Sequence, residues 1–430
     1  MPPTAAPTPN PDPAPATASA RASASAPAGR DVGGGFTLRE VPLDGLSTGD
    51  LARWEALHAA QEGVANPFSA PIWVDAWYRR FVPRAKRHLL LVSHGDQLVG
   101  VAPLYEQRLH LARLAVARRL VPVGGGRTSA LEIPPLLAAA GHGRAVTRAV
   151  VEQALTCDVA WSELSLSREQ GWLNAQPAGG PGQPPVFQRH QQVRACVVLR
   201  LGDTWDETRS AFRRNVKESV RRARNRLAKD GRPWQILHRT GTDLDAAAVE
   251  RLLALHGARS RDQQSASLHH DAYAAPADAS FVRELLPRLG EAGQASLVEL
   301  ELGGEVVATQ LVLHPPGGVY FHSSGFLPGV WELSPITALQ VSTMERAITR
   351  GDRWANFSPG PNEAKLRWSE RLTTFDDFAF GVATHATMAR YTAFFLAKDV
   401  RQLRHERSWG LASASAAVRA RPTRAVVTRP

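Results

Sequence analysis

The sequence predicts an α/β protein of mixed α+β type, built from two tandem domains whose central sheets are mostly antiparallel. Its 430 residues are more than one compact core usually spans, and 43% of them are apolar, which suffices for two cores. Each half contains a strand, a tight glycine-containing turn and a second strand, flanked by helical segments. We interpret this repeated order as a tandem duplication; the alternative is that two common glycine-turn hairpins recur without being related.

Composition divides the chain into five segments. Residues 1–33 are rich in Pro, Ala, Ser and Thr, so they cannot bury enough apolar surface to offset the entropy of ordering. The residues after Ser408 have a similar composition with scattered arginines. The expected segments are therefore a disordered N-terminus at 1–33, a first domain at 34–195, a second domain at 196–382, an amphipathic terminal helix at 383–408 and a disordered basic tail at 409–430.

The first domain is expected to start near Phe36. One of its predicted helices is amphipathic, because Trp73, Trp77 and Phe81 recur every four residues. The predicted elements, in chain order, are a helix at Ile72–Phe81 opened by Pro71, a hairpin of His88–Ser93 and Leu98–Tyr105, a helix at Arg144–Leu155, a strand at Trp161–Ser167 and a loop at Gly171–Pro185.

The second domain repeats this arrangement. A proline that follows a serine marks the start of its last helix, since Ser is a preferred N-cap and Pro is favoured at the first helical position. Gly351 ends that helix as a C-cap. The predicted elements are a strand at Val193–Leu201, helices at Asp206–Lys229 and Asp245–Arg259, a meander of Ser296–Leu302, Val306–His314 and Val319–Ser323, the helix Ser334–Arg350 and a strand at Trp354–Phe357.

The net charge of +11 is concentrated in two places. Residues 205–232 contain ten Lys/Arg and four Asp/Glu, and residues 381–430 contain nine and two. Such local basic patches attract phosphates of coenzyme A, tRNA or lipid alike. No apolar run is long enough to span a membrane, and no apolar signal-peptide core is present, so we expect a cytoplasmic protein.

Neither cysteine nor histidine spacing suggests a metal site. Cys157 and Cys196 lie in separate apolar segments, which favours buried structural thiols over a redox or nucleophilic role.

Several residues of the second domain have chemistry that suits a site. Tyr320, His322 and Ser324 alternate along one predicted strand and share a face, with Ser323 on the other face. Because the unperturbed pKa of histidine lies near neutrality, His322 is a candidate general base; a structural histidine is the alternative. The N–H groups near Ile336, just after the Ser334 N-cap, form an anion site because the helix dipole points at them.

The helix at 206–229 has an apolar stripe and a basic remainder. Its stripe faces a core, and its arginines either form a solvated face or bind a phosphate-bearing substrate. The stripe consists of Phe212, Val216, Val220, Ala223 and Leu227.

Three segments together resemble a known family: residues 66–105, the Arg-rich stretch Phe212–Gly231, and Gly304–Trp368. The third is the most specific, since its end is similar to the family's Asp-Phe-x-x-Gly…Tyr-Lys-x-x-Trp/Phe pattern. The family is the GNAT-like acyltransferases called BioF2-like or CelD-like, which are relatives of the FemAB peptidyltransferases. The resemblance spans residues 36–380.

The resemblance implies two GNAT-like domains, an acyl donor bound at the second one, and Lys365 as the lysine that stabilises the developing oxyanion. The catalytic candidates are Lys365, His322 and Tyr320. The donor-binding candidates are Ser334, Ile336, Thr337, Asn356 and Gly360, and the substrate-binding candidates are Arg214, Arg221 and Trp368. Two positions depart from the family, because Asn356 stands where an acidic residue is usual and Ala364 where an aromatic residue is usual.

The leading hypothesis is an N-acyltransferase that moves an acyl group, such as acetyl, from acyl-CoA to a small-molecule or sugar amine by direct attack in a ternary complex, without a metal. A Fem-type peptidyltransferase that uses aminoacyl-tRNA is the second hypothesis, favoured by the Arg-rich helix. A relative that only binds ligand is the third, favoured by Asn356 and Ala364. The pyrophosphate-loop motif of ordinary GNAT enzymes does not occur in the sequence.

Overall fold

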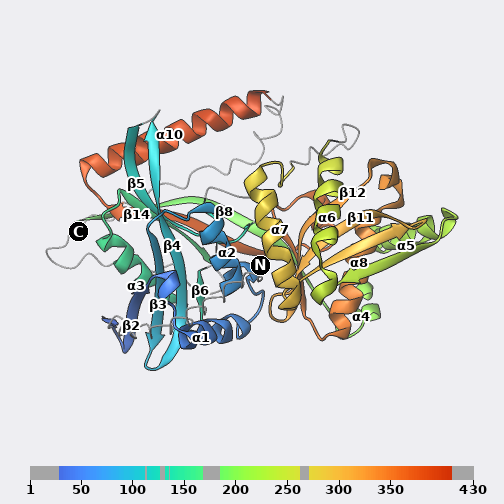
Figure 1. The fold of residues 1–430 in the computed structure, drawn as a ribbon, viewed down its shortest axis with the longest axis horizontal. Coiled ribbons are helices and arrows are strands. Elements are labelled where there is room, and N and C mark those ends of the chain that lie inside the picture. Colours follow the sequence, from blue (N-terminus) through green and yellow to red (C-terminus); the bar gives the residue numbers. More distant parts are fainter. Residues whose placement is uncertain are drawn as a thin grey trace, which may run out of the picture.

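One continuous sheet, with fourteen strands among the described residues, runs through both halves of the protein (Figure 1). The structure is a computed structural model that describes residues 29–111, 114–125, 131–134, 136–167, 185–261 and 271–408. Its strand order is β1-β2-β3-β4-β5-β7-β14-β8-β13-β12-β11-β10-β9, and β6 pairs with β4. Among the described strand pairs, β5–β7 and β12–β13 are parallel and the others are antiparallel. The sheet is therefore mostly antiparallel, as the sequence predicts.

The strands are β1 Arg30–Gly33, β2 Phe36–Val41, β3 Arg87–His94, β4 Gln97–Leu111, β5 Leu114–Pro122, β6 Leu137–Ala138, β7 Trp161–Ser167, β8 Val186–Arg200, β9 Trp234–Arg239, β10 Ala295–Leu302, β11 Glu305–Leu313, β12 Gly318–Phe326, β13 Trp354–Pro359 and β14 Leu372–Val382. The α-helices are α1 Thr48–Ala59, α2 Pro71–Phe81, α3 Gly143–Thr156, α4 Trp205–Ser210, α5 Arg214–Lys229, α6 Ala246–Ser260, α7 Pro276–Glu291, α8 Pro335–Thr349, α9 Glu363–Leu366 and α10 His385–Ser408.

The two halves have the same order of elements, which supports the predicted duplication. In the first half two helices, α1 and α2, precede the meander β3–β4–β5, and α3 then leads to the parallel strand β7. In the second half α6 and α7 precede β10–β11–β12, and α8 leads to the parallel strand β13. The fold is thus a tandem pair of similar α/β units.

The two units exchange their last strands at the centre of the sheet. Strand β8 follows the first unit but pairs with β13 of the second, and β14 follows the second unit but pairs with β7 of the first. The two exchanged strands also pair with each other over their length. The boundary expected at residue 195 therefore falls inside β8, which is hydrogen-bonded on both sides.

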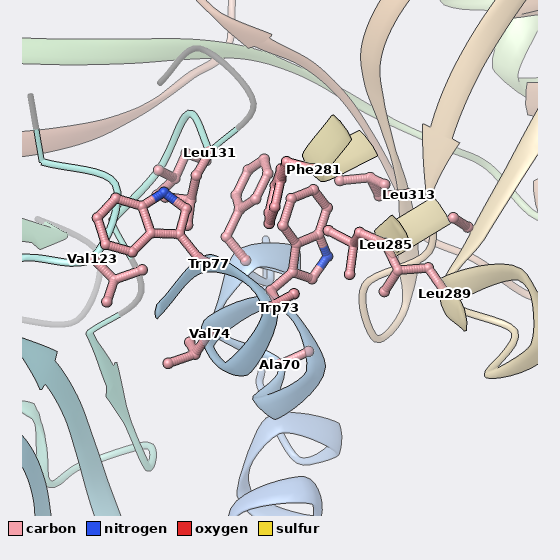
Figure 2. Packing of buried hydrophobic residues seen from close by; sticks show 14 of the residues in the cluster. Ala70, Trp73, Val74, Trp77, Val123, Leu131, Phe281, Leu285, Leu289 and Leu313 are labelled. Atoms are coloured by element: carbon pink, nitrogen blue, oxygen red, sulfur yellow. The ribbon is translucent and has the colours of Figure 1, made fainter. Parts of the chain in front are cut away.

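A single hydrophobic core joins the two units. Figure 2 shows Trp73 of α2 facing Phe281 and Leu285 of α7, and the Trp73 and Phe281 rings lie 6.0 Å apart. Both rings are at most 2% exposed. Since this core contains buried residues of α1, α2, α6, α7 and the sheet between them, the units are held in one fixed arrangement.

Separate cores cover the opposite faces of the sheet. Helix α3 packs on the first unit, while α5 and α8 pack on the second. The predicted apolar stripe is confirmed, because Phe212, just before α5, and Val216 and Leu227 of α5 are buried in the core of the second unit. Val220 packs against this core, and Ala223 is buried as well.

The segment expected to form a terminal helix, 383–408, contains helix α10. Its residues Met388, Tyr391, Phe394 and Phe395 pack on Trp161 and Phe187.

Most predicted elements are present, and the structure adds strands that were not predicted: β2, β5, β6, β9 and β14. It differs from the predictions in three further respects. The helix expected at Asp206–Lys229 is two helices, α4 and α5, because Arg213 has an extended backbone (φ −61°, ψ 154°). Helices α1 and α7 were not predicted. Arg30–Gly33 is not disordered but forms β1, whose Arg30 pairs with Leu38. The remaining predictions for residues 1–28, 168–184 and 409–430 lie outside the described residues.

No helix within the described ranges is both long and apolar enough to cross a membrane. The same part of the chain contains no group of His, Cys, Asp and Glu side chains arranged to hold a metal ion.

Candidate active site

Strands β12 and β13 run in parallel and then separate. Gly318, Val319 and Tyr320 pair with Trp354, Ala355 and Asn356, and the pairing of the two strands ends there. Both strands continue, β12 to Phe326 and β13 to Pro359. A wedge therefore opens beyond Tyr320 and Asn356, where backbone groups of both strands no longer bond to each other.

Lys365 lies at the β13 side of this wedge. It is on the short helix α9, whose start is capped by the Asn362 side chain, which accepts from the Lys365 backbone N–H at 3.1 Å. The Lys365 Nζ donates to Ser358 Oγ at 3.0 Å and to the Pro359 carbonyl at 2.6 Å. Burial lowers the pKa of Lys365, and the nearby Glu132 carboxylate opposes that shift. The ammonium group is thus fixed, largely desolvated and aimed at the end of β13.

The end of β13 has an unusual backbone. Ser358 has φ +64°, in the left-handed region that costs a residue with a side chain energy, and its side chain is buried. The Asn356 side chain, which is 3% exposed, accepts from the Ser358 N–H at 2.9 Å. The residue that departs from the family pattern therefore holds this turn in place. Gly360, with φ +78°, donates its N–H to the Ala195 carbonyl at 3.1 Å.

Tyr320, the last residue of β12 that pairs with β13, contacts a carboxylate from the other half of the protein. Tyr320 is fully buried, and its hydroxyl donates to Glu132 Oε2 at 2.6 Å. Burial raises the pKa of Glu132, whereas His322, the Tyr320 hydrogen bond and Lys365 lower it. Glu132 was missed in the sequence, because it stands alone in a loop 188 residues away from Tyr320.

His322 follows Tyr320 on β12 and lies among aromatic rings. Its ring centroid is 5.9 Å from that of Phe68, 6.5 Å from that of Trp73 and 6.4 Å from that of Tyr320. Two of these rings come from the first unit. The structure thus brings the three predicted catalytic residues, Lys365, His322 and Tyr320, around the charge of Glu132.

The prediction that Ser323 lies opposite His322 is wrong, because β12 has a bulge. Ser324 pairs with Gln310 and Phe321 pairs with Val312, so two residues of β12 face one residue of β11. The bulge turns Ser323 toward the α6–α7 side, where its Oγ lies 2.6 Å from the Tyr273 hydroxyl.

The start of α8 differs from the expected N-cap. Ser334 has φ +57° and no side-chain capping bond, and its Oγ instead accepts from Arg226 at 3.3 Å. The Thr337 N–H, expected to be free for an anion, donates to the Ser334 carbonyl at 3.1 Å. The Thr337 Oγ1 accepts from Arg367 Nη2 at 2.9 Å, and the Ile336 side chain packs on the core. Two arginines therefore supply the positive charge at this helix start.

The predicted substrate-binding residues lie elsewhere. Arg214 and Arg221 are exposed on α5, and Arg221 pairs with Glu218 at 2.7 Å. Trp368 is 4% exposed and stacks on Phe357 at 5.7 Å, so we assign it to core packing rather than to substrate contact.

Both cysteines are protonated thiols at neutral pH. Burial raises the pKa of Cys157 to about 11 and that of Cys196 to about 12, which fits the predicted structural role.

Known proteins resemble this chain in sequence over one region and in fold over most of its length. Residues 214–366 match the model of the acetyltransferase (GNAT) domain family. The crystal structure of FemX superposes with a TM-score of 0.53 at 11% identity and covers 76% of this chain and 95% of FemX. A search of curated protein sequences found no match.

Two further solved structures cover the chain at lower similarity. The C-terminal domain of a putative lysylphosphatidylglycerol synthetase from Agrobacterium fabrum has a TM-score of 0.47 at 11% identity, over 81% of this chain and 96% of its own. A tandem GNAT protein from the clavulanic acid biosynthesis pathway has a TM-score of 0.38 at 14% identity, over 80% and 97%.

Proposed function

Because residues 214–366 form a GNAT domain within a fold like that of FemX, we propose that the chain is an N-acyltransferase. Its donor is an acyl-CoA such as acetyl-CoA, and its acceptor is a small-molecule or sugar amine. The amine attacks the donor carbonyl directly, with both substrates bound at once. A cytoplasmic location, where acyl-CoA is available, is part of this proposal.

The observation that carries the proposal is Lys365 at the β12–β13 wedge. An acyl carbonyl lying in the wedge becomes an oxyanion when the amine attacks, and that oxyanion needs a fixed donor. Lys365 is desolvated and held by Ser358 and Pro359, so its charge is preorganised before the reaction begins. The interaction strengthens as negative charge develops, which is what lowers the barrier.

The start of α8 suits the donor phosphates. Arg226 and Arg367 lie there beside the helix N-terminus, and burial lowers the pKa of Arg367, so a phosphate would relieve the cost of its desolvation. Helix α8 connects β12 to β13, the two strands that form the wedge. The anion site at the start of α8 therefore belongs to the same structural unit as the wedge.

The test is a turnover assay with the full chain. Acetyl-CoA is supplied with glucosamine, lysine or hydroxylamine as the acceptor, and released thiol and acetylated product are measured. The proposal predicts thiol release that depends on the acceptor. Release that does not depend on any amine, together with no acetylated product, would contradict it.

A second candidate function is aminoacyl transfer from tRNA. The exposed arginines of α5, including Arg214 and Arg221, form a basic face next to α8, and such a face binds nucleic acid. If alanyl-tRNA is the donor, its affinity falls steeply with salt, and Arg214→Glu weakens it further. A flat salt response with retained acetyl-CoA turnover excludes this candidate.

A further inference from the structure

Glu132 belongs to the first unit but lies at the site of the second. It follows β5, in a short segment anchored on both sides by buried side chains, Leu131 and Ile133. Leu131 packs so closely on Gly124 that a Cβ there would lie 2.4 Å from its Cδ2. Arg194 of β8 donates to the Glu132 carbonyl at 3.1 Å. The backbone of Glu132 is therefore held by the packing of Leu131 and Ile133 and by the hydrogen bond from Arg194.

Among the described residues, Tyr320 is the hydrogen-bond donor to this carboxylate. The Tyr320 hydroxyl lies 2.6 Å from Oε2, and Tyr320 is itself the last residue of β12 that pairs with β13. As a whole residue, Glu132 is half-buried. Glu132 thus lies beside Tyr320, at the point where β12 and β13 begin to separate.

The surroundings of Glu132 favour a proton acceptor. Burial raises its pKa, and this makes the carboxylate more basic than one at the surface. Lys365 and His322 lower the pKa of the same carboxyl and so oppose the effect of burial. The titratable and charged groups that face it are Tyr320, His322, Lys365, Tyr273, Cys196 and Arg194.

We propose that Glu132 is the base that receives a proton from the acceptor amine. This inference rests on the proposed N-acyltransferase function. The acceptor is then a primary aliphatic amine that arrives as an ammonium ion. Glu132 takes one proton from it, and the freed lone pair forms the new C–N bond while the carbonyl oxygen becomes the oxyanion held by Lys365.

The remaining steps return the site to its starting state. The tetrahedral intermediate collapses, the bond from carbon to the leaving group breaks, and the leaving thiolate takes the second proton from nitrogen. Glu132 then releases its proton to solvent. The first unit would thereby supply the base, and the second unit the donor site and Lys365, so neither unit is complete alone.

The deciding variant is Glu132→Gln in the full chain, assayed with acetyl-CoA. The amide oxygen can still accept from Tyr320, so the fold is kept. We expect kcat/KM for lysine at pH 7.5 to fall about 10²–10³-fold, as removal of a general base does. With hydroxylamine, which is already neutral at this pH, the loss should be below about tenfold. In the wild type, kcat/KM for lysine should fall toward acidic pH as Glu132 is protonated, and this fall should be absent in Glu132→Gln. Glu163→Gln, a hydrogen-bonded carboxylate elsewhere in the first unit, is the matched control.

Tyr320→Phe provides an independent variant. It removes the hydrogen bond that lowers the pKa of Glu132, so the acidic limb should shift to higher pH. Equal losses for lysine and hydroxylamine in Glu132→Gln, or a wild-type pH profile, would overturn the role of Glu132 while leaving the proposed function intact. If the wild-type chain transfers acetyl to neither amine, both proposals fail.

Discussion

Replacing Lys365 with alanine tests the assigned oxyanion donor. The Nζ makes two short contacts, to Ser358 Oγ at 3.0 Å and to the Pro359 carbonyl at 2.6 Å. A hydrogen bond from a charged group contributes about 1.5–3 kcal/mol, and here the desolvation of the ammonium offsets much of that in the resting protein. The free energy of unfolding should therefore fall by only about 1–2 kcal/mol. The transition state loses an oxyanion donor, which costs about 10²–10³-fold in kcat.

The assay compares steady-state acetyl transfer with the affinity for acetyl-CoA measured by calorimetry. We expect kcat to fall by the stated factor while the Kd for acetyl-CoA changes by less than about threefold, since the oxyanion forms only after attack. Lys229→Ala, at an exposed lysine near the end of α5, should behave like the wild type. If the Lys365→Ala protein unfolds cooperatively on heating, so that it is folded, and still has the wild-type kcat, Lys365 is not the oxyanion donor.

Three further predictions follow from the structure. Ser358→Gly should raise stability by up to about 1 kcal/mol, because glycine tolerates φ +64°, yet lower turnover through loss of the contact to Lys365; urea unfolding and kinetics on one preparation test both signs. Gly325→Ala should destabilise the protein by about 3 kcal/mol, since a Cβ there would lie 2.3 Å from a backbone nitrogen of α6. An unchanged unfolding midpoint would contradict this, because it would mean that α6 can move away at little cost. Burial lowers the pKa of His58 to about 4 and of His314 to about 3, so the unfolded chain binds more protons below pH 6.5. The contribution of these two histidines to the free energy of unfolding should be fully present above pH 6.5. It should fall by about 1.4 kcal/mol per pH unit for each histidine, until the pH reaches the lowered pKa of that histidine. Urea unfolding midpoints that do not change with pH would contradict this.

Local sequence signals predicted the elements of the second unit well. The hairpin of β10 and β11 turns at Gly303 and Gly304, both with positive φ, and Gly351 ends α8 in the same conformation. These features depend on neighbouring residues alone, so they can be identified without a structure. Helix α7 was missed because Pro287 lies inside it, and a proline argues against a helix at the level of sequence.

The assembly of the site could not be predicted in the same way. Glu132 meets Tyr320 only because the two units share one core and exchange β8 and β14. The bulge at Ser323 depends on the pairing of β12 with β11, and alternation along one strand gives no sign of it. The left-handed backbone of Ser334 follows from the preceding turn, although serine before proline is the usual sign of a capping side chain.

The most direct test of the central claim is a crystal structure of the full chain with a non-hydrolysable thioether analogue of acetyl-CoA. We predict that the analogue's carbonyl oxygen lies in the wedge between β12 and β13, within about 3 Å of Lys365 Nζ. The phosphates of the analogue should lie beside Arg226 and Arg367. An analogue bound only in the first unit, or one whose carbonyl points away from Lys365, would contradict it.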